Sequence, residues 1–246
     1  MPLRKLTGVI LRRRDLGEFD RLLTIFTAEE GMIEALAKGV RKIQSKLGSK
    51  LDLFNLLQLQ VAQTRGKWPT IIGVDVEINQ LKSDVDFAQF TLLCALAEIS
   101  YFGQREQGED AFGFKLFREA LAAIKDTADQ NVLLAYSIKL LARLGYLASP
   151  LQCAHCAAQK ANYYRQTGML LCQACGGREA MISKEAVTML AQLLADELTK
   201  IKLAQFNLLT KAEVAAIIQD LSEYHFEQKL KAWSLLRYNE ILKTTV

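Results

Sequence analysis

Hydrophobic positions in the first 80 residues recur over short stretches, in the pattern typical of β-strands. The segments TGVILRRRD, DRLLTIFTAEEG and MIEALAKGV alternate or run apolar over a few residues each. A longer stretch, LLQLQVAQTRGKWPTIIGVDVE, resembles two strands joined by a turn at Arg65-Gly66. About five short strands separated by glycines predict a small closed β-barrel, because closure removes the exposed strand edges.

After residue 81 the apolar spacing changes to that of helices. The segments DFAQFTLLCALAEISYF, GFKLFREALAAIKD and NVLLAYSIKLLARLGY each place apolar residues on one helical face, and the same spacing resumes from Ser183. Thr210 and Glu213 have the spacing of a capping box, which predicts a helix that begins there. The sequence therefore predicts an α+β protein, with a barrel over residues 1–80 and a mainly α-helical domain over residues 81–246.

Composition supports a folded protein of the cytosol. Half of the residues are hydrophobic and 24% are charged, as in a globular domain with a full core. The opening segment MPLRKLTGVILRRRDLGEFD lacks the apolar core of a signal peptide, and no apolar run reaches the length of a membrane span. We therefore expect a cytoplasmic protein with no membrane partner. In that compartment paired cysteines are metal ligands or redox groups more often than structural disulfides.

Four of the five cysteines form two close pairs at about residues 150–180. Two residues separate the members of each pair, and fifteen residues separate the pairs. A Cys-x2-Cys turn places two sulfurs on one side of a tight loop, so two such turns joined by a hairpin can surround one metal ion tetrahedrally. Because four thiolates leave no position open for water, the pattern predicts one structural Zn²⁺ in a zinc-ribbon-like insert, held by Cys153, Cys156, Cys172 and Cys175.

The sequence is also compatible with other interpretations of the cysteine segment. The thiols could form two disulfides, stay idle, act as a redox pair or hold an iron–sulfur cluster. His155 is a rival ligand inside the first pair. Lys160, Arg165 and Arg178 could offset part of the negative charge of a four-thiolate site. The fifth cysteine, Cys94, lies in an apolar helical run and is expected to be a small core residue.

Positive charge concentrates in the first 80 residues, which carry 13 Lys and Arg against 9 Asp and Glu. Five of these cations lie between residues 38 and 50, a segment without any acid that we call the basic loop. A basic loop between barrel strands could follow a phosphate backbone, and Trp68 or an exposed Phe54 could stack on a base. The alternative is a solvated loop with Trp68 in the core.

No known catalytic pattern is present in the sequence. It holds two histidines, His155 and His225, and lacks GxSxG and HExxH. His225 lies in a helical segment and is expected on the surface or in packing. We therefore expect a protein that is not an enzyme.

The chain resembles the recombination protein O family, the bacterial DNA repair family, over nearly its whole length. The opening GVILRRRDLGEFDRLLTIFTAEEG and the following ALAKGVRK carry the resemblance, together with the helical stretch and the two cysteine pairs. The more specific positions are Glu18, Asp20, Arg21, Thr27, Gly31 and Lys38-Gly39.

The resemblance implies an oligonucleotide-binding (OB) fold at residues 1–80 and a role in recombinational repair. It implies binding to single- and double-stranded DNA and annealing of complementary strands. It also implies action with recombination protein R on DNA coated by single-stranded-DNA-binding protein, contact with the C-terminal tail of that protein, and indirect help in loading RecA, in association with the bacterial nucleoid. The DNA-binding residues expected on this basis are Lys38, Arg41, Lys42, Lys46 and Lys50, with Arg13, Arg14 and Arg21 as weaker candidates.

Two other functions compete with this interpretation. An RNA-binding or translation-associated protein could combine the same barrel with a zinc ribbon, and a preference for the 2′-hydroxyl would identify it. A metal-dependent hydrolase acting on nucleic acid would need an open metal position and a general base, and its cysteine variants would lose activity while staying folded.

Overall fold

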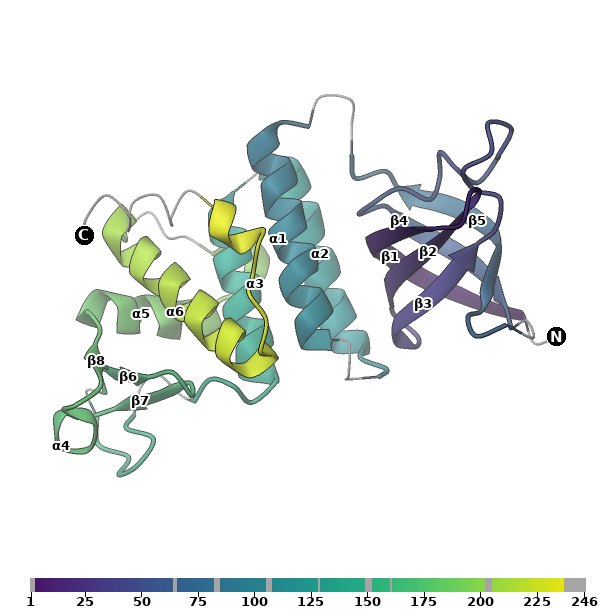
Figure 1. Ribbon diagram of the computed structural model, residues 1–246. Helices are drawn as coiled ribbons and strands as arrows, with labels where there is room; N and C mark the ends of the chain where they lie inside the picture. Colours follow the sequence, from purple (N-terminus) through teal and green to yellow (C-terminus); the bar gives the residue numbers. More distant parts are fainter. Residues whose placement is uncertain are drawn as a thin grey trace. The chain divides into compact units, whose positions relative to one another are not determined.

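The structure is a computed structural model that describes residues 3–63, 66–81, 85–104, 108–127, 129–148, 152–159, 161–201 and 205–236. The chain divides into two compact units, Met1–Phe87 with Ser100–Leu121 and Ala88–Ile99 with Ala122–Val246. The elements, drawn in Figure 1, are β1 (Leu3–Leu16), β2 (Asp20–Thr27), β3 (Gly31–Ala37), β4 (Leu56–Ala62), β5 (Thr70–Ile78), α1 (Phe87–Gln104), α2 (Ala111–Thr127), α3 (Gln130–Arg143), β6 (Tyr163–Arg165), β7 (Met169–Leu171), α4 (Gln173–Gly176), β8 (Ala180–Met181), α5 (Lys184–Ala195), η1 (Leu198–Lys200), α6 (Leu208–Phe226) and η2 (Trp233–Leu235).

Strands β1 to β5 form a closed barrel in the order β1-β2-β3-β5-β4. The long strand β1 pairs antiparallel with β2 and with β4, which lets it close the barrel. Its register with β2 shifts between Ile10 and Arg12, and such a bulge bends a strand between two neighbours. Strands β3 and β5 pair in parallel at Leu36 and Thr70. The N-terminal sheet predicted from the short apolar stretches is thus confirmed.

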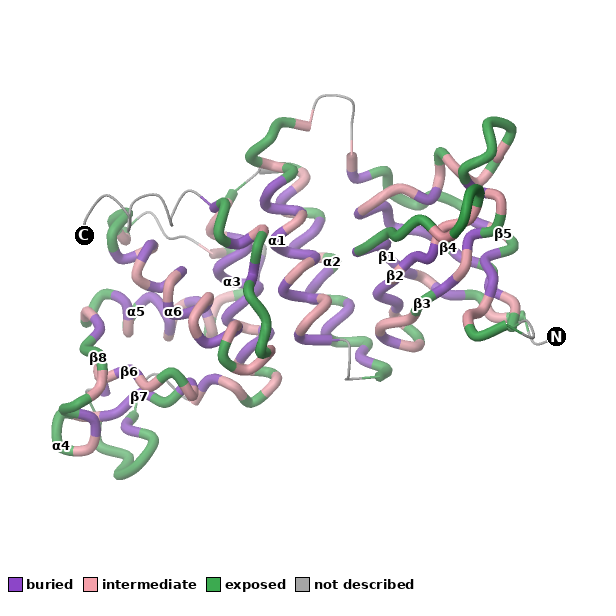
Figure 2. Tube along the Cα trace, viewed as in Figure 1, coloured by how far each residue is buried: buried purple, intermediate pink, exposed green. Residues whose placement is uncertain are grey.

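Apolar side chains from the inward face of the strands fill the barrel. Along β4 the buried and exposed positions alternate, as Figure 2 shows by colour, because successive strand residues point to opposite faces. The basic loop and the residues after it also contribute to this core through Val40, Leu51 and Leu53. The loop is therefore anchored by its apolar residues, and its charged residues are left outside. The neighbouring Phe54 is 2% exposed, so it cannot stack on a base.

The outer face of β2 is covered within the first unit by part of α2. The ring of Phe26 meets the rings of Phe114 and Phe117 edge-on, with centroids 5.3 and 5.6 Å apart. At the same end of β2, Gly31 has φ +69°, and a Cβ there would lie 1.7 Å from the carbonyl oxygen of Gly108. Only glycine fits this approach of two backbones.

In the second unit, helices α3, α5 and α6 contact one another around an apolar core. The predicted start of α6 is wrong. The helix begins at Leu208, because the side chain of Asn207 accepts the N–H of Thr210 at 2.8 Å. Glu213 does not complete a capping box. Instead its carboxylate accepts the backbone N–H and the hydroxyl of Ser183, at 2.8 and 2.5 Å, and so joins α6 to the start of α5.

The longest described helices are α6, with 19 residues, and α1, with 18. Within the described ranges, no helix combines the length and the apolar character needed to cross a bilayer.

Candidate metal centre and candidate nucleic-acid interface

The four paired cysteines come together in space. Their Sγ atoms all lie within 4.8 Å of one another, and those of Cys156 and Cys172 are 3.7 Å apart. Cys153 is buried, Cys156 is exposed, and the other two are half-buried. Four soft sulfur ligands at these separations could bind one metal ion. The grouping predicted from the spacing of the pairs is therefore present in the structure.

Two tight turns and a hairpin build this cluster. After Cys153 the chain turns back at Ala157, which adopts φ +58° and donates its N–H to the carbonyl oxygen of Cys153 at 2.9 Å. Strands β6 and β7 carry the chain to the second turn, where Cys172 precedes the short helix α4. Gly176 packs close to this hairpin, since a Cβ there would lie 2.5 Å from that of Leu171. These local features position the sulfurs.

The pKa values of the Cys153 and Cys175 thiols shift in opposite directions, because the hydrogen bonds that each sulfur makes differ. The backbone N–H of Cys172, helped by those of Cys156 and His155, lowers the pKa of the Cys153 thiol to about 6. Hydrogen bonds to the thiols of Cys156 and Cys172 raise the pKa of Cys175 to about 12. Four adjacent thiols cannot all ionise without a cation between them. The four sulfurs could therefore all serve as thiolate ligands only around a cation.

Of the three basic residues expected to offset the charge of the cluster, one is paired with a carboxylate. Arg165 forms an ion pair with Glu179 at 2.8 Å, so its charge is already balanced. Arg178 is exposed, and Lys160 lies outside the described residues. His155 is exposed and is not part of the group of potential metal ligands found among the described residues. The four sulfurs are thus the complete donor set that the described residues provide.

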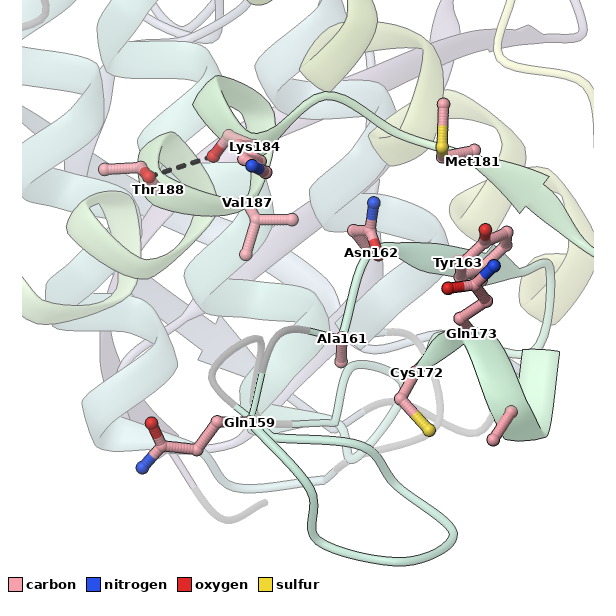
Figure 3. Close-up of a pocket in the computed structure, with 11 residues that line it drawn as sticks. Gln159, Ala161, Asn162, Tyr163, Cys172, Gln173, Met181, Lys184, Val187 and Thr188 are labelled. Atoms are coloured by element: carbon pink, nitrogen blue, oxygen red, sulfur yellow. Dashed lines mark hydrogen bonds between the residues drawn. The ribbon is translucent and has the colours of Figure 1, made fainter. Parts of the chain in front are cut away.

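A cavity of about 970 Å³ adjoins the four-cysteine cluster within the second unit. Its wall includes Cys172, the β-strand residues Tyr163 and Met181, and Lys184 and Val187 from α5. Figure 3 shows Lys184 and Val187 on one side of this space, with Tyr163 and Cys172 across from them. Met181 is 69% exposed at its edge. The cavity is thus largely apolar, and Lys184 is a cation in its wall.

On the barrel, the structure brings the basic loop against the turn between β1 and β2. This turn, residues 16–20, is called the hairpin tip here. Asp20 accepts the N–H of Gly39 at 2.7 Å, and the carbonyl oxygen of Phe19 accepts the N–H of Arg41 at 3.0 Å. Cations from two distant parts of the sequence therefore share one end of the barrel.

The predicted DNA-binding residues fall into two groups by their partners. Four of them form ion pairs, namely Arg13 with Asp52, Arg21 with Asp15, Arg41 with Asp15 and Lys50 with Asp75. The hydrogen bond from Arg21, together with the nearby charge of Arg41, holds the pKa of the Asp15 carboxyl below its ordinary value.

The other four predicted residues are Lys38, Lys42, Lys46 and Arg14, and all are exposed. Within the part of the chain that the structure describes, none of these four forms an ion pair with a carboxylate. They are the cations most available to an anionic ligand.

Two aromatic residues of the barrel lie close to lysines, Trp68 to Lys67 and Phe19 to Lys42. Trp68 is half-buried, and its indole N–H donates to the carboxylate of Glu34 at 3.0 Å. Phe19, which the sequence did not single out, is 42% exposed at the hairpin tip, with the Lys42 ammonium 5.3 Å from its ring centroid. The context DLGEFD, with three acidic residues and one glycine, could have marked it as a turn residue and therefore as exposed.

Comparison with known families accounts for nearly the whole chain. Residues 1–76 match the family model described as Recombination protein O N terminal, and residues 85–234 match Recombination protein O C terminal. The DNA repair protein RecO of Desulfitobacterium hafniense (strain DSM 10664 / DCB-2) is 27% identical over 241 residues, covering 93% of this chain and 87% of that protein. The chain therefore belongs to the recombination protein O family, and this membership supports a role in DNA repair and recombination.

Proposed function

We propose that this protein is a mediator of DNA repair and recombination that binds single- and double-stranded DNA and anneals complementary strands. The observation that carries the proposal is the group of exposed, unpaired cations on the basic loop of a closed five-stranded barrel. Family membership supports the biological setting. The strand order and the parallel pairing of β3 with β5 support assigning the barrel as an OB-fold, a fold that binds oligonucleotides.

The contribution proposed for each DNA-binding residue depends on whether it already pairs with a carboxylate. Lys38, Lys42 and Lys46 contact phosphates, because no carboxylate among the described residues neutralises them. Arg14 adds a fourth exposed charge. The paired cations Arg13, Arg21, Arg41 and Lys50 contribute less, since each would have to leave a carboxylate or share it with a phosphate.

Annealing on this surface requires no bond chemistry. Lysine side chains neutralise phosphates and displace their counterions, so two complementary strands can approach with less mutual repulsion. The contacts are made to the backbone and carry no sequence information. We therefore propose a protein that is not an enzyme, acts without nucleotide hydrolysis, and loses affinity steeply as the salt concentration rises.

Zn²⁺ is the metal ion proposed for the four-cysteine cluster. A Zn–S bond of about 2.3 Å places the sulfurs of a tetrahedral site about 3.8 Å apart. The 3.7 Å separation of Cys156 and Cys172 fits that value, and the other separations need to shorten by at most about 1 Å. Because all four positions are taken by sulfur, the ion would be structural, holding the β6–β7 hairpin and α4 together.

The proposed protein partners follow from the family. Recombination protein R is the partner with which the chain would act on DNA coated by single-stranded-DNA-binding protein, and RecA loading would follow indirectly. The largely apolar cavity with Lys184 in its wall suits an acidic peptide with an apolar end, such as the C-terminal tail of single-stranded-DNA-binding protein. This setting is the bacterial cytoplasm, at the nucleoid.

Equilibrium binding to labelled oligonucleotides tests the proposal. Single-stranded DNA, duplex DNA and single-stranded RNA of one length would be titrated at several salt concentrations. We expect binding to both DNA forms, with affinity that falls linearly with salt on logarithmic axes. A clear preference for RNA would instead favour an RNA-binding protein, and the absence of binding at low salt would refute the proposed interface.

A further inference from the structure

The hairpin tip is held in one position relative to the basic loop. Phe19 accepts the backbone N–H of Arg41 at 3.0 Å, and Asp20 accepts that of Gly39 at 2.7 Å. Gly17 closes the tip with φ +61°, a conformation that glycine adopts readily. These hydrogen bonds already fix the backbone at Phe19. Its side chain therefore loses little additional conformational freedom when a ligand binds.

Two large apolar side chains are exposed at this place. Phe19 is 42% exposed, and Ile43, beside Lys42 in the basic loop, is fully exposed. A single exposed apolar residue needs no explanation, but an aromatic ring exposed among cations is the composition of a single-stranded nucleic-acid site. The ammonium group of Lys42 lies over this ring, 5.3 Å from its centroid, so the aromatic face and a cation are found together at the hairpin tip.

The charges around the ring define the chemistry of its ligand. The cations of Lys38, Lys42 and Lys46 have no carboxylate partner among the described residues. Asp15 is already paired with two arginines, while Glu18 is exposed on the tip itself. A phosphate chain is therefore expected on the side of the basic loop, away from Glu18, with a base reaching the ring.

We propose that Phe19 is a stacking platform for an unpaired nucleobase and that Ile43 borders this subsite, while Lys42 contacts a neighbouring phosphate. The inference rests on the proposed function, because it names a base-binding position within the proposed DNA interface. A base must leave its helical stack to reach the ring, so the subsite favours single strands over duplexes. Every base has an aromatic face, and the subsite therefore has no strong sequence preference.

Binding measurements with two matched oligonucleotides distinguish the contribution of base stacking to affinity from that of phosphate charge. One is a single strand with all its bases, and the other has the same length and phosphates but abasic sugars. Phe19→Ala should weaken binding to the first by about 5- to 150-fold, the range expected for losing one stacked base, with little change for the second. Its salt dependence should remain that of the unchanged protein, because no phosphate contact is lost.

Two further variants control for folding and for aromatic residues in general. Phe19→Trp keeps an aromatic face and should restore the affinity. Phe112→Ala removes a ring of α2 that is 61% exposed, on the helix that packs against the far end of β2. This variant should bind DNA like the unchanged protein. Equal binding of Phe19→Ala and the unchanged protein to the base-containing strand would overturn the subsite. If the unchanged protein binds neither oligonucleotide at low salt, the proposed function itself fails.

Discussion

The carboxylate of Asp20 accepts the backbone N–H of Gly39 at 2.7 Å, which ties the hairpin tip to the first turn of the basic loop. Removing this acceptor in Asp20→Ala should lower the free energy of unfolding by about 1.5–3 kcal/mol, the usual value for a hydrogen bond to a charged group. Urea denaturation measures this change. Asp20→Asn, which keeps an acceptor oxygen, should retain most of the stability. Equal stability of the alanine variant and the unchanged protein would contradict the anchoring role.

The unpaired lysines of the basic loop should dominate DNA affinity. Lys46→Glu should weaken single-strand binding by about tenfold at low salt and reduce the slope of affinity against salt by about 0.7, since one phosphate contact is lost. Adding Lys42→Glu should double the loss in slope. The charge-matched control is Lys115→Glu on α2, where the lysine pairs with Glu119. Anisotropy titrations that give the loop variants and the control the same affinity would contradict the assignment.

The β6–β7 hairpin beside the four-cysteine cluster depends on Gly168, which adopts φ +89°. A Cβ there would lie 1.7 Å from the carbonyl oxygen of Tyr146. Gly168→Ala should therefore lower the free energy of unfolding by at least about 2 kcal/mol, from the left-handed conformation and the clash together. Gly145, at φ +78° with nothing near the added carbon, is the matched control and should cost about 1 kcal/mol when changed to alanine. Equal losses of unfolding free energy in the two alanine variants would show that the close approach of Gly168 to Tyr146 does not affect stability.

The four-cysteine cluster should bind one zinc ion per chain, measured by elemental analysis of the purified protein. Cys153→Ser should remove the ion and lower the melting temperature by about 6–12 °C, if the lost stabilisation is about 3 kcal/mol. Cys94→Ala is the control, because this thiol lies in α1 away from the cluster and burial raises its pKa. It should keep the ion.

Measuring the DNA affinity of Cys153→Ser distinguishes a structural role of the metal ion from a catalytic or DNA-binding role. The barrel has its own core, so the variant should bind single-stranded DNA within about twofold of the unchanged protein. A large loss of affinity with the fold intact would place the ion in the DNA interface instead.

Local patterns in the sequence predict those features that depend on near neighbours. Periodicity separates the strand-rich N-terminal region from the helices, because burial of one face repeats every two residues in a strand and every 3.6 in a helix. The Cys-x2-Cys spacing predicts the grouping of the four cysteines, because each turn brings its own two sulfurs together. The two pairs then need only one hairpin, β6–β7, to meet.

Features that depend on distant residues could not be predicted in this way. Nothing near Arg13 in the sequence indicates that Asp52, 39 positions later, balances its charge. Glu213 has the correct spacing for a capping box with Thr210 but bonds to Ser183 instead, because tertiary contacts compete with local ones. The exposure of Phe19 likewise depends on how the hairpin tip meets the basic loop.

Strand annealing tests the central claim most directly. Two complementary labelled oligonucleotides would be mixed with the purified protein, without nucleotide, over a series of salt concentrations, and the metal content of the same sample would be measured. We predict annealing faster than the spontaneous rate, fading as salt rises, at one zinc per chain. No acceleration at low salt, in a folded sample that holds its zinc, would contradict the account.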